Sequence, residues 1–126
     1  EPSYLRAMIG LPAFHRIKLL HRSDPDTVRA AVQSISEAEG WKPLRRLMLI
    51  SVEERDDDDP YTFDLKTISS SPLTFGERIY IKIGETEVYV LSECLNPAQI
   101  IDFGRNRRIV EHILDQLVEH GIPLDR

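Results

Sequence analysis

The sequence has a single cysteine, Cys94, and no apolar stretch long enough to cross a membrane as a helix. A lone cysteine cannot form a disulfide within the chain, which argues against a disulfide-stabilised secreted scaffold. The N-terminal residues also lack the charged and then apolar pattern of a signal peptide. We therefore expect an intracellular protein, cytoplasmic or nuclear, that makes no contact with a membrane.

Motifs that carry chemistry are equally scarce. The sequence has no glycine-rich phosphate loop and no exposed-serine elbow, and Cys94 has no histidine beside it. The four histidines do not fall at the spacings of a metal-ligand motif: His15, His21, His112 and His120. We therefore expect no cofactor and no metal, and we favour a non-catalytic protein over an enzyme.

What is present suffices for one globular domain. The chain has 126 residues, of which 41% are hydrophobic, so we treat residues 1–126 as a single domain with one core. Residues 1–12 form a possible N-terminal arm. The chain begins with Glu1 rather than methionine, and we expect it to be a subunit or a fragment of a larger protein.

The spacing of apolar residues predicts the elements. Charged and apolar residues alternate from Phe14 to His21, which indicates a strand. Pro25 suits the first position of a helix, which we expect to end at Gly40. The apolar residues between them recur every three or four positions and define one buried stripe: Val28, Ala31, Val32, Ile35 and Ala38.

Four further strands and a long helix follow. We expect strands over Leu44 to Val52, Tyr61 to about Ile68, Ile79 to Ile83 and Glu87 to Leu91. Asn96 and Pro97 resemble a helix start, and an apolar stripe then continues to His120. This last segment is either one bent helix or two helices joined near Asn106.

The order strand, helix, four strands, long helix predicts an α+β fold. We expect an antiparallel sheet of four to five strands with the helices packed on one face. From the first helix onward, the order of elements is similar to the topology of RWD-type interaction domains. The likeness covers roughly 100 residues, rests on element order alone and is used only as a topological analogy, since a fold does not define a function.

Charge is concentrated in one loop. The net charge is −5, and the run Glu53–Asp59 contains six acids and one arginine. The rest of the chain therefore has equal numbers of acidic and basic residues. Residues 53–60 should form an acidic hairpin loop; a turn centred on Asp57 would place Asp64 opposite Ile50. Two sets of residues are candidates for binding a partner: the acids Asp56, Asp57, Asp58 and Asp59, and the bases Arg105, Arg107 and Arg108.

Three functions are compatible with these patterns. The first is a protein-protein interaction or dimerisation module that binds a protein partner or a second copy of itself. The second is a metal-dependent nuclease or phosphodiesterase, because Asp64 and Lys66 with an upstream acid such as Glu53 or Glu54 resemble the acid and Asp-x-Lys pattern of restriction-endonuclease-like nucleases. The third is RNA or nucleotide binding through the Arg105–Arg108 cluster.

Overall fold

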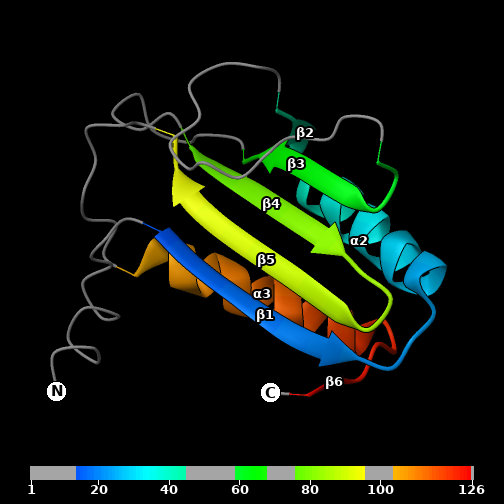
Figure 1. The fold of residues 1–126 in the computed structure, drawn as a ribbon. Helices are drawn as coiled ribbons and strands as arrows, with labels where there is room; N and C mark the ends of the chain where they lie inside the picture. Colours follow the sequence, from blue (N-terminus) through cyan, green and yellow to red (C-terminus); the bar gives the residue numbers. More distant parts are fainter. Residues whose placement is uncertain (1–13, 45–58, 68–75, 96–103, 126) are drawn as a thin grey trace, which may run out of the picture.

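A computed structural model describes residues 14–44, 59–67, 76–95 and 104–125 (Figure 1). Its elements follow one another in this order: β1 (Phe14–His21), α2 (Pro25–Glu39), β2 (Lys42–Pro43), β3 (Thr62–Lys66), β4 (Glu77–Ile83), β5 (Glu87–Cys94), α3 (Arg105–Glu119) and β6 (Leu124–Asp125). In the part of the chain so described, no helix is both long and apolar enough to span a membrane.

All six strands join one antiparallel sheet in the order β2-β3-β4-β5-β1-β6. Strands β3, β4 and β5 form a meander, and β5 then pairs with β1, the first strand of the chain, along its length. The α+β class and the antiparallel sheet are confirmed. The sheet has one strand more than the upper limit of the prediction because β2 and β6 add two-residue edges that are too short to give a periodic signal.

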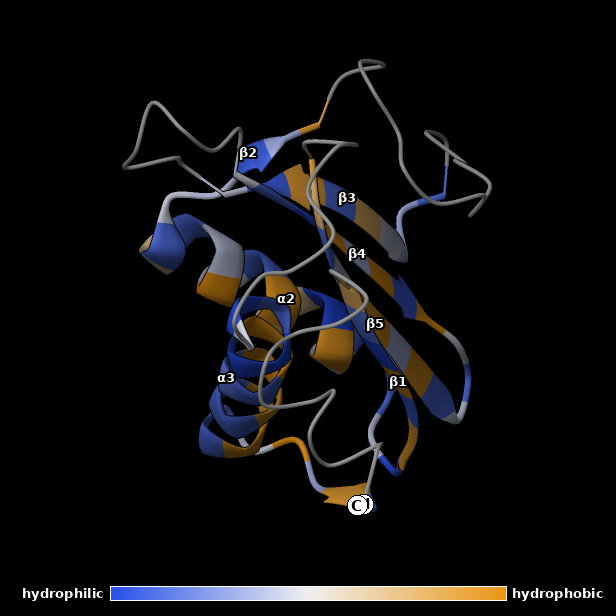
Figure 2. Ribbon diagram, turned by 90° about the vertical axis from the view of Figure 1, so that its left-hand side faces the viewer, coloured by the Kyte–Doolittle hydropathy of each residue, from blue (hydrophilic) through white to orange (hydrophobic). Residues whose placement is uncertain are grey.

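Both helices cover the same face of the sheet (Figures 1 and 2). Helix α2 starts with Pro25 and buries the predicted stripe from Val28 to Ile35, but the last predicted member, Ala38, is exposed. Ser36, four residues after Val32, is buried instead, and its hydroxyl donates to the Val32 carbonyl at 2.8 Å. Helix α3 buries its own stripe, which includes Ile113 and Leu117, both fully inaccessible to solvent. Each such side chain contributes about 1.5–3 kcal/mol when it leaves water, so this layer stabilises most of the fold.

The pleat of the sheet separates two sets of side chains, visible as alternating bands along the strands (Figure 2). On β4, Ile79, Ile81 and Ile83 belong to the core beneath the helices. The intervening Arg78 and Tyr80 point to the opposite face, yet both are buried. At this end of β4, side chains on the face without helices are therefore shielded from solvent, and one of them, Arg78, is charged.

Several predictions fall at or beyond the limits of the described residues. The arm at residues 1–12, the acidic residues 53–58 and the helix start at residues 96–103 lie outside them. So does the predicted strand from Leu44 to Val52, of which only Leu44 is described, directly after β2.

The predicted register of the acidic hairpin is wrong. Asp64 does not lie opposite Ile50, because the main-chain carbonyl of Asp64 accepts a hydrogen bond from Leu44 N–H at 2.8 Å. Lys42 pairs with Lys66 in the same ladder. The connection between β2 and β3 is therefore longer than a tight turn about Asp57 requires.

Candidate functional site

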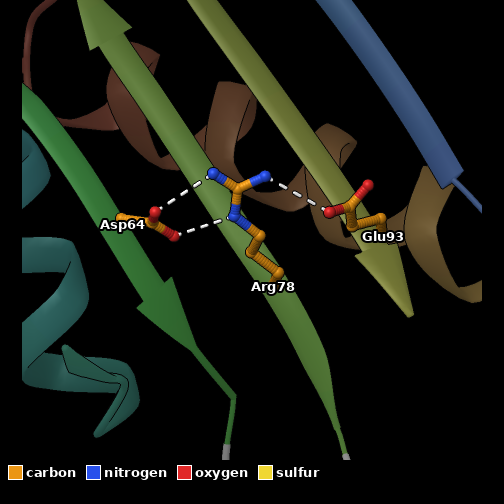
Figure 3. Close-up of polar contacts among 3 residues, drawn as sticks. All are labelled: Asp64, Arg78 and Glu93. Carbon is orange, nitrogen blue, oxygen red and sulfur yellow. Dashed lines mark hydrogen bonds and ion pairs between the residues drawn. The ribbon is translucent and has the colours of Figure 1, made fainter. Parts of the chain in front are cut away.

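A buried arginine joins three neighbouring strands on the face without helices (Figure 3). Arg78 on β4 is fully buried, and its Nε and Nη2 donate to the two carboxylate oxygens of Asp64 on β3 at 2.9 and 3.0 Å. Its Nη1 donates to Glu93 on β5 at 3.2 Å. Burial lowers the pKa of Arg78, but hydrogen bonds and attraction from Asp64 and Glu93 outweigh burial and hold the pKa above its usual value.

This ion-pair network bears on the nuclease hypothesis. Both oxygens of Asp64 accept hydrogen bonds from Arg78, so a metal ion bound to this carboxylate would lie beside a buried guanidinium, whose positive charge would repel it. Lys66 is exposed, and the upstream acids Glu53 and Glu54 lie outside the described residues. Among the residues that the structure does describe, no group of acids, histidines and cysteines is placed to hold a metal. The geometry gives this hypothesis no support.

A second polar network lies on the helix-covered side, where β4 begins. Glu77 is buried, and its Oε2 accepts from Arg105 Nε at 2.9 Å while its Oε1 accepts from Thr67 Oγ1 at 2.8 Å. Nearby, Ser92 Oγ donates to Asn106 Oδ1 at 2.7 Å, and Asn106 Nδ2 contacts Cys94 Sγ at 3.4 Å. The first two residues of α3 are thus fixed to the sheet by polar contacts.

A groove of about 440 Å³ opens beside this network, between the end of α2 and the start of α3. Helix α2 ends at Glu39, and Gly40 takes a left-handed conformation (φ 75°) that lets Trp41 N–H bond back to Ser36 C=O at 3.1 Å. This turn places the Trp41 side chain in the groove. The residues that line the groove are Glu39, Trp41, Thr67, Arg105, Arg108, Ile109 and His112.

The structure separates the three arginines of the predicted cluster. Arg105 and Arg108 line the groove, because residues three apart lie on one face of a helix. Arg107 is exposed and does not line it. One turn beyond Arg108, His112 Nε2 lies 2.6 Å from Glu39 Oε1, which ties α3 to the end of α2.

Of the four acids predicted to bind a partner, only Asp59 is described, and its carboxylate has a local role. Asp59 Oδ1 accepts from Tyr61 N–H at 2.9 Å, and Oδ2 accepts from the Thr62 hydroxyl at 2.8 Å. These hydrogen bonds lower the pKa of Asp59 from its usual 3.8. Asp59 therefore closes the turn that leads into β3, while Asp56, Asp57 and Asp58 lie outside the described residues.

Among the described residues, the outer edge of β1 pairs with another strand only at its end. His21 N–H donates to Thr86 C=O at 2.9 Å on the β5 side, so by alternation the main-chain groups of Arg16 and Lys18 face away from β5. Strand β6 pairs only with Leu20 and His21. The outward main-chain groups of Arg16 and Lys18 have no partner in the part of the chain that is described.

Sequence reasoning missed several of these features. Trp41 follows the predicted helix stop at Gly40, but nothing in the spacing links it to arginines more than 60 positions away. Arg78 and Lys82 both alternate with the isoleucines of β4. This pattern is typical of a solvent-exposed face and does not indicate a buried ion pair. Asp64 gave no separate signal, because it alternates with Phe63 and Leu65 in the same way as the exposed Lys66 does.

Comparisons with known proteins add no family: no family model matches the sequence, and no curated protein and no solved structure matches it.

Proposed function

We propose that this protein is an interaction module, not an enzyme, and that it binds an extended acidic segment of a partner protein along the open edge of β1. The observation that carries the proposal is the edge of β1 at Arg16 and Lys18, which no other described strand covers. Exposed strand edges accept a further strand through main-chain hydrogen bonds, and side chains at alternate positions then select the partner. The single buried thiol, Cys94, fits the intracellular setting that we propose with it.

Side chains along β1 favour an acidic partner. Arg16 and Lys18 are exposed on the same face of the strand, between Phe14 and Leu20, which are 40% and 49% exposed. Lys18 already lies 3.4 Å from Glu87 of β5, which shows that this face accommodates an opposite charge beside the strand. An added strand with acids opposite the two bases would extend this pattern.

A second copy of the chain fits the edge less well. Antiparallel pairing of two β1 edges sets Arg16 against Arg16 or Lys18 of the other copy, and like charges directly opposite each other destabilise a ladder. We therefore propose a different protein as the occupant and expect the isolated chain to be monomeric. A dimer that dissociates when the edge is blocked would overturn the choice of occupant.

The test uses a short capped peptide in which glutamate alternates with valine, and its counterpart with lysine in place of glutamate. We expect the acidic peptide, and not the basic one, to shift the NMR amide signals of Arg16 and Lys18 and to slow their hydrogen exchange. Equal binding of both peptides, or shifts confined to another surface, would overturn the proposal.

Matched variants separate edge binding from general charge. Arg16→Pro removes an outward N–H that bonds to no described residue, so the protein should fold normally and lose peptide binding. Arg16→Glu should weaken binding without any change in the backbone. Lys82→Glu is the control, since Lys82 is exposed on the interior strand β4 and the change in net charge equals that of Arg16→Glu. Unchanged binding by Arg16→Pro would refute strand addition.

A further inference from the structure

The groove between α2 and α3 combines features that the proposed function does not use. It contains Trp41, the only tryptophan of the chain, together with Arg105 and Arg108. It lies on the helix layer, whereas the open edge belongs to β1. Its volume of about 440 Å³ falls within the range of small-molecule sites.

Arg105 is positioned to hold an anion. Its Nε is fixed by the buried Glu77, while its two terminal nitrogens have no hydrogen-bond partner among the described residues. The side chain is 47% exposed at the groove, so these donors are accessible. Arg108 lines the same groove one turn further along α3. Two guanidinium groups one helical turn apart suit a phosphate better than a single carboxylate.

Trp41 supplies a surface for a planar ring. Its side chain is partly exposed, and its indole N–H has no acceptor in the described part of the chain. Ile109 adds an apolar side chain to the lining. Bases stack on aromatic side chains without strong sequence preference, and an indole beside two arginines is the combination that nucleotide-binding surfaces use.

Glu39, which has the one carboxylate among the described residues that line the groove, is already engaged. Glu39 Oε1 lies 2.6 Å from His112 Nε2, so its charge is directed to the imidazole. Thr67 Oγ1 donates to Glu77 Oε1 and accepts from Glu77 N–H. The Thr67 hydroxyl therefore belongs to the polar network of Glu77 and Arg105. Among the described residues that line the groove, the terminal nitrogens of Arg105 and the Trp41 indole N–H are therefore the open donors, and Arg108 adds a second positive charge.

We propose that this groove binds a nucleoside phosphate, with the phosphate on Arg105 and Arg108 and the base against Trp41. The proposal does not depend on the edge of β1, and either can fail without the other. A free mononucleotide and the end of a single-stranded RNA share this chemistry, and the experiment distinguishes them.

The fluorescence of Trp41 reports binding directly, because no other tryptophan contributes to the signal. We expect AMP to quench it with saturation, adenosine to quench it only weakly, and inorganic phosphate to compete with AMP without quenching. If an adenylate trinucleotide binds much more tightly than AMP, the natural source is single-stranded RNA; equal affinity indicates a free nucleotide. Absence of AMP quenching at millimolar concentration would overturn the proposal.

Neighbouring arginines provide a matched pair of variants. Arg108→Gln should weaken AMP binding about tenfold, as expected for the loss of one charge-assisted hydrogen bond. Arg107→Gln changes the net charge equally but lies outside the groove, so it should leave the affinity unchanged. Equal losses in both variants would show a general charge effect and refute the site. Arg105 is unsuitable for this comparison, since its removal leaves the buried Glu77 without an ion pair.

Trp41→Phe tests the stacking contact without removing an aromatic ring. Measured by NMR titration, this variant should bind AMP more weakly than the parent protein and bind inorganic phosphate equally well. If AMP and phosphate lose affinity to the same extent, Trp41 does not contact the base and the proposed arrangement is wrong.

Discussion

Arg78 and Asp64 face each other across β4 and β3 as a two-pronged ion pair, with both nitrogen-oxygen distances at or below 3.0 Å (Figure 3). The Arg78 side chain is 0% exposed and that of Asp64 is 10% exposed, so water screens the pair poorly. Tyr80 adds its ring, whose centroid lies 5.0 Å from the guanidinium carbon. The pair therefore links two strands on the face that carries no helix.

Breaking this pair should destabilise the protein strongly. Asp64→Asn leaves the buried guanidinium without its main counter-charge, and such a loss costs about 3–5 kcal/mol. Arg78→Lys should also destabilise, because an ammonium cannot reproduce the planar fork that bonds both oxygens of Asp64. Urea unfolding at neutral pH measures both free energies of unfolding.

Lys66→Gln is the control for that experiment. Lys66 lies two residues from Asp64 on the same strand, but it is exposed, and its replacement should change the free energy of unfolding by less than about 0.5 kcal/mol. A value for Asp64→Asn as small as that of Lys66→Gln would show that Arg78 does not depend on Asp64.

The elements that sequence predicted well are those long enough to show a period. Helix α2 repeats its apolar residues every three or four positions from Val28 to Ala38, and β4 alternates Ile79, Ile81 and Ile83 with polar residues. Strands β2 and β6 have two residues each, which is less than a detectable pattern, so they follow only from the tertiary structure.

The candidate sites were less predictable because they depend on distant pairs. Arg78 meets Asp64 and Glu93 only once the registers of two strand pairs are fixed, and residue spacing alone does not give those registers. The same limit applies to Trp41 and Arg105, which come together through the packing of α2 and α3. By contrast, the helical period already separates Arg107 from Arg105 and Arg108.

The turn closed by Asp59 should give the stability of the protein a dependence on pH. Hydrogen bonds from Tyr61 N–H and the Thr62 hydroxyl lower the pKa of Asp59 in the folded state. Its contribution is therefore present above the usual pKa of 3.8 and is lost as the pH falls through the lower folded value. Asp59→Ala should be about 1 kcal/mol less stable at neutral pH.

Urea unfolding of both proteins across the acid range checks this expectation. The difference between the parent protein and Asp59→Ala should shrink below pH 3.8 as the carboxylate becomes protonated. A difference that stays constant down to the lowest pH at which both proteins fold would contradict a role for the charged form.

Cys94 provides a probe of local opening at the base of α3. It is the only cysteine, it is 1% exposed, and its sulfur contacts Asn106 Nδ2. We expect a thiol reagent such as DTNB to react only when this region opens. Asn106→Ala removes the partner of the buried Ser92 hydroxyl, a loss of about 1–3 kcal/mol, and should accelerate labelling at least about fivefold.

The exposed neighbour Arg107 gives the comparison. Arg107→Ala alters the same turn of α3 without a buried contact, so its labelling rate should match that of the parent protein. Labelling of the native parent at the rate of an unprotected thiol would show that Cys94 is accessible and would contradict the packing at this end of the sheet.

Gly76 and Gly121 form a natural pair for separating backbone strain from steric conflict. Both have positive φ angles, 86° and 83°, so alanine at either position loses about 1–2 kcal/mol to the left-handed conformation. A Cβ at Gly121 would meet no atom within 4 Å, whereas one at Gly76 would lie 2.9 Å from the carbonyl oxygen of Thr67. That carbonyl belongs to the backbone and cannot move away as a flexible side chain would.

Gly76→Ala should therefore destabilise the protein by about 1–3 kcal/mol more than Gly121→Ala, as overpacking usually does. The excess arises because Thr67 is held on both sides: its N–H bonds to Glu77 C=O at 3.0 Å, and its hydroxyl bonds to the Glu77 carboxylate. Thermal and urea unfolding of the two variants measure the difference directly. Equal losses would mean that the contact between Gly76 and Thr67 relaxes freely, and that the network of Thr67, Glu77 and Arg105 is not rigid.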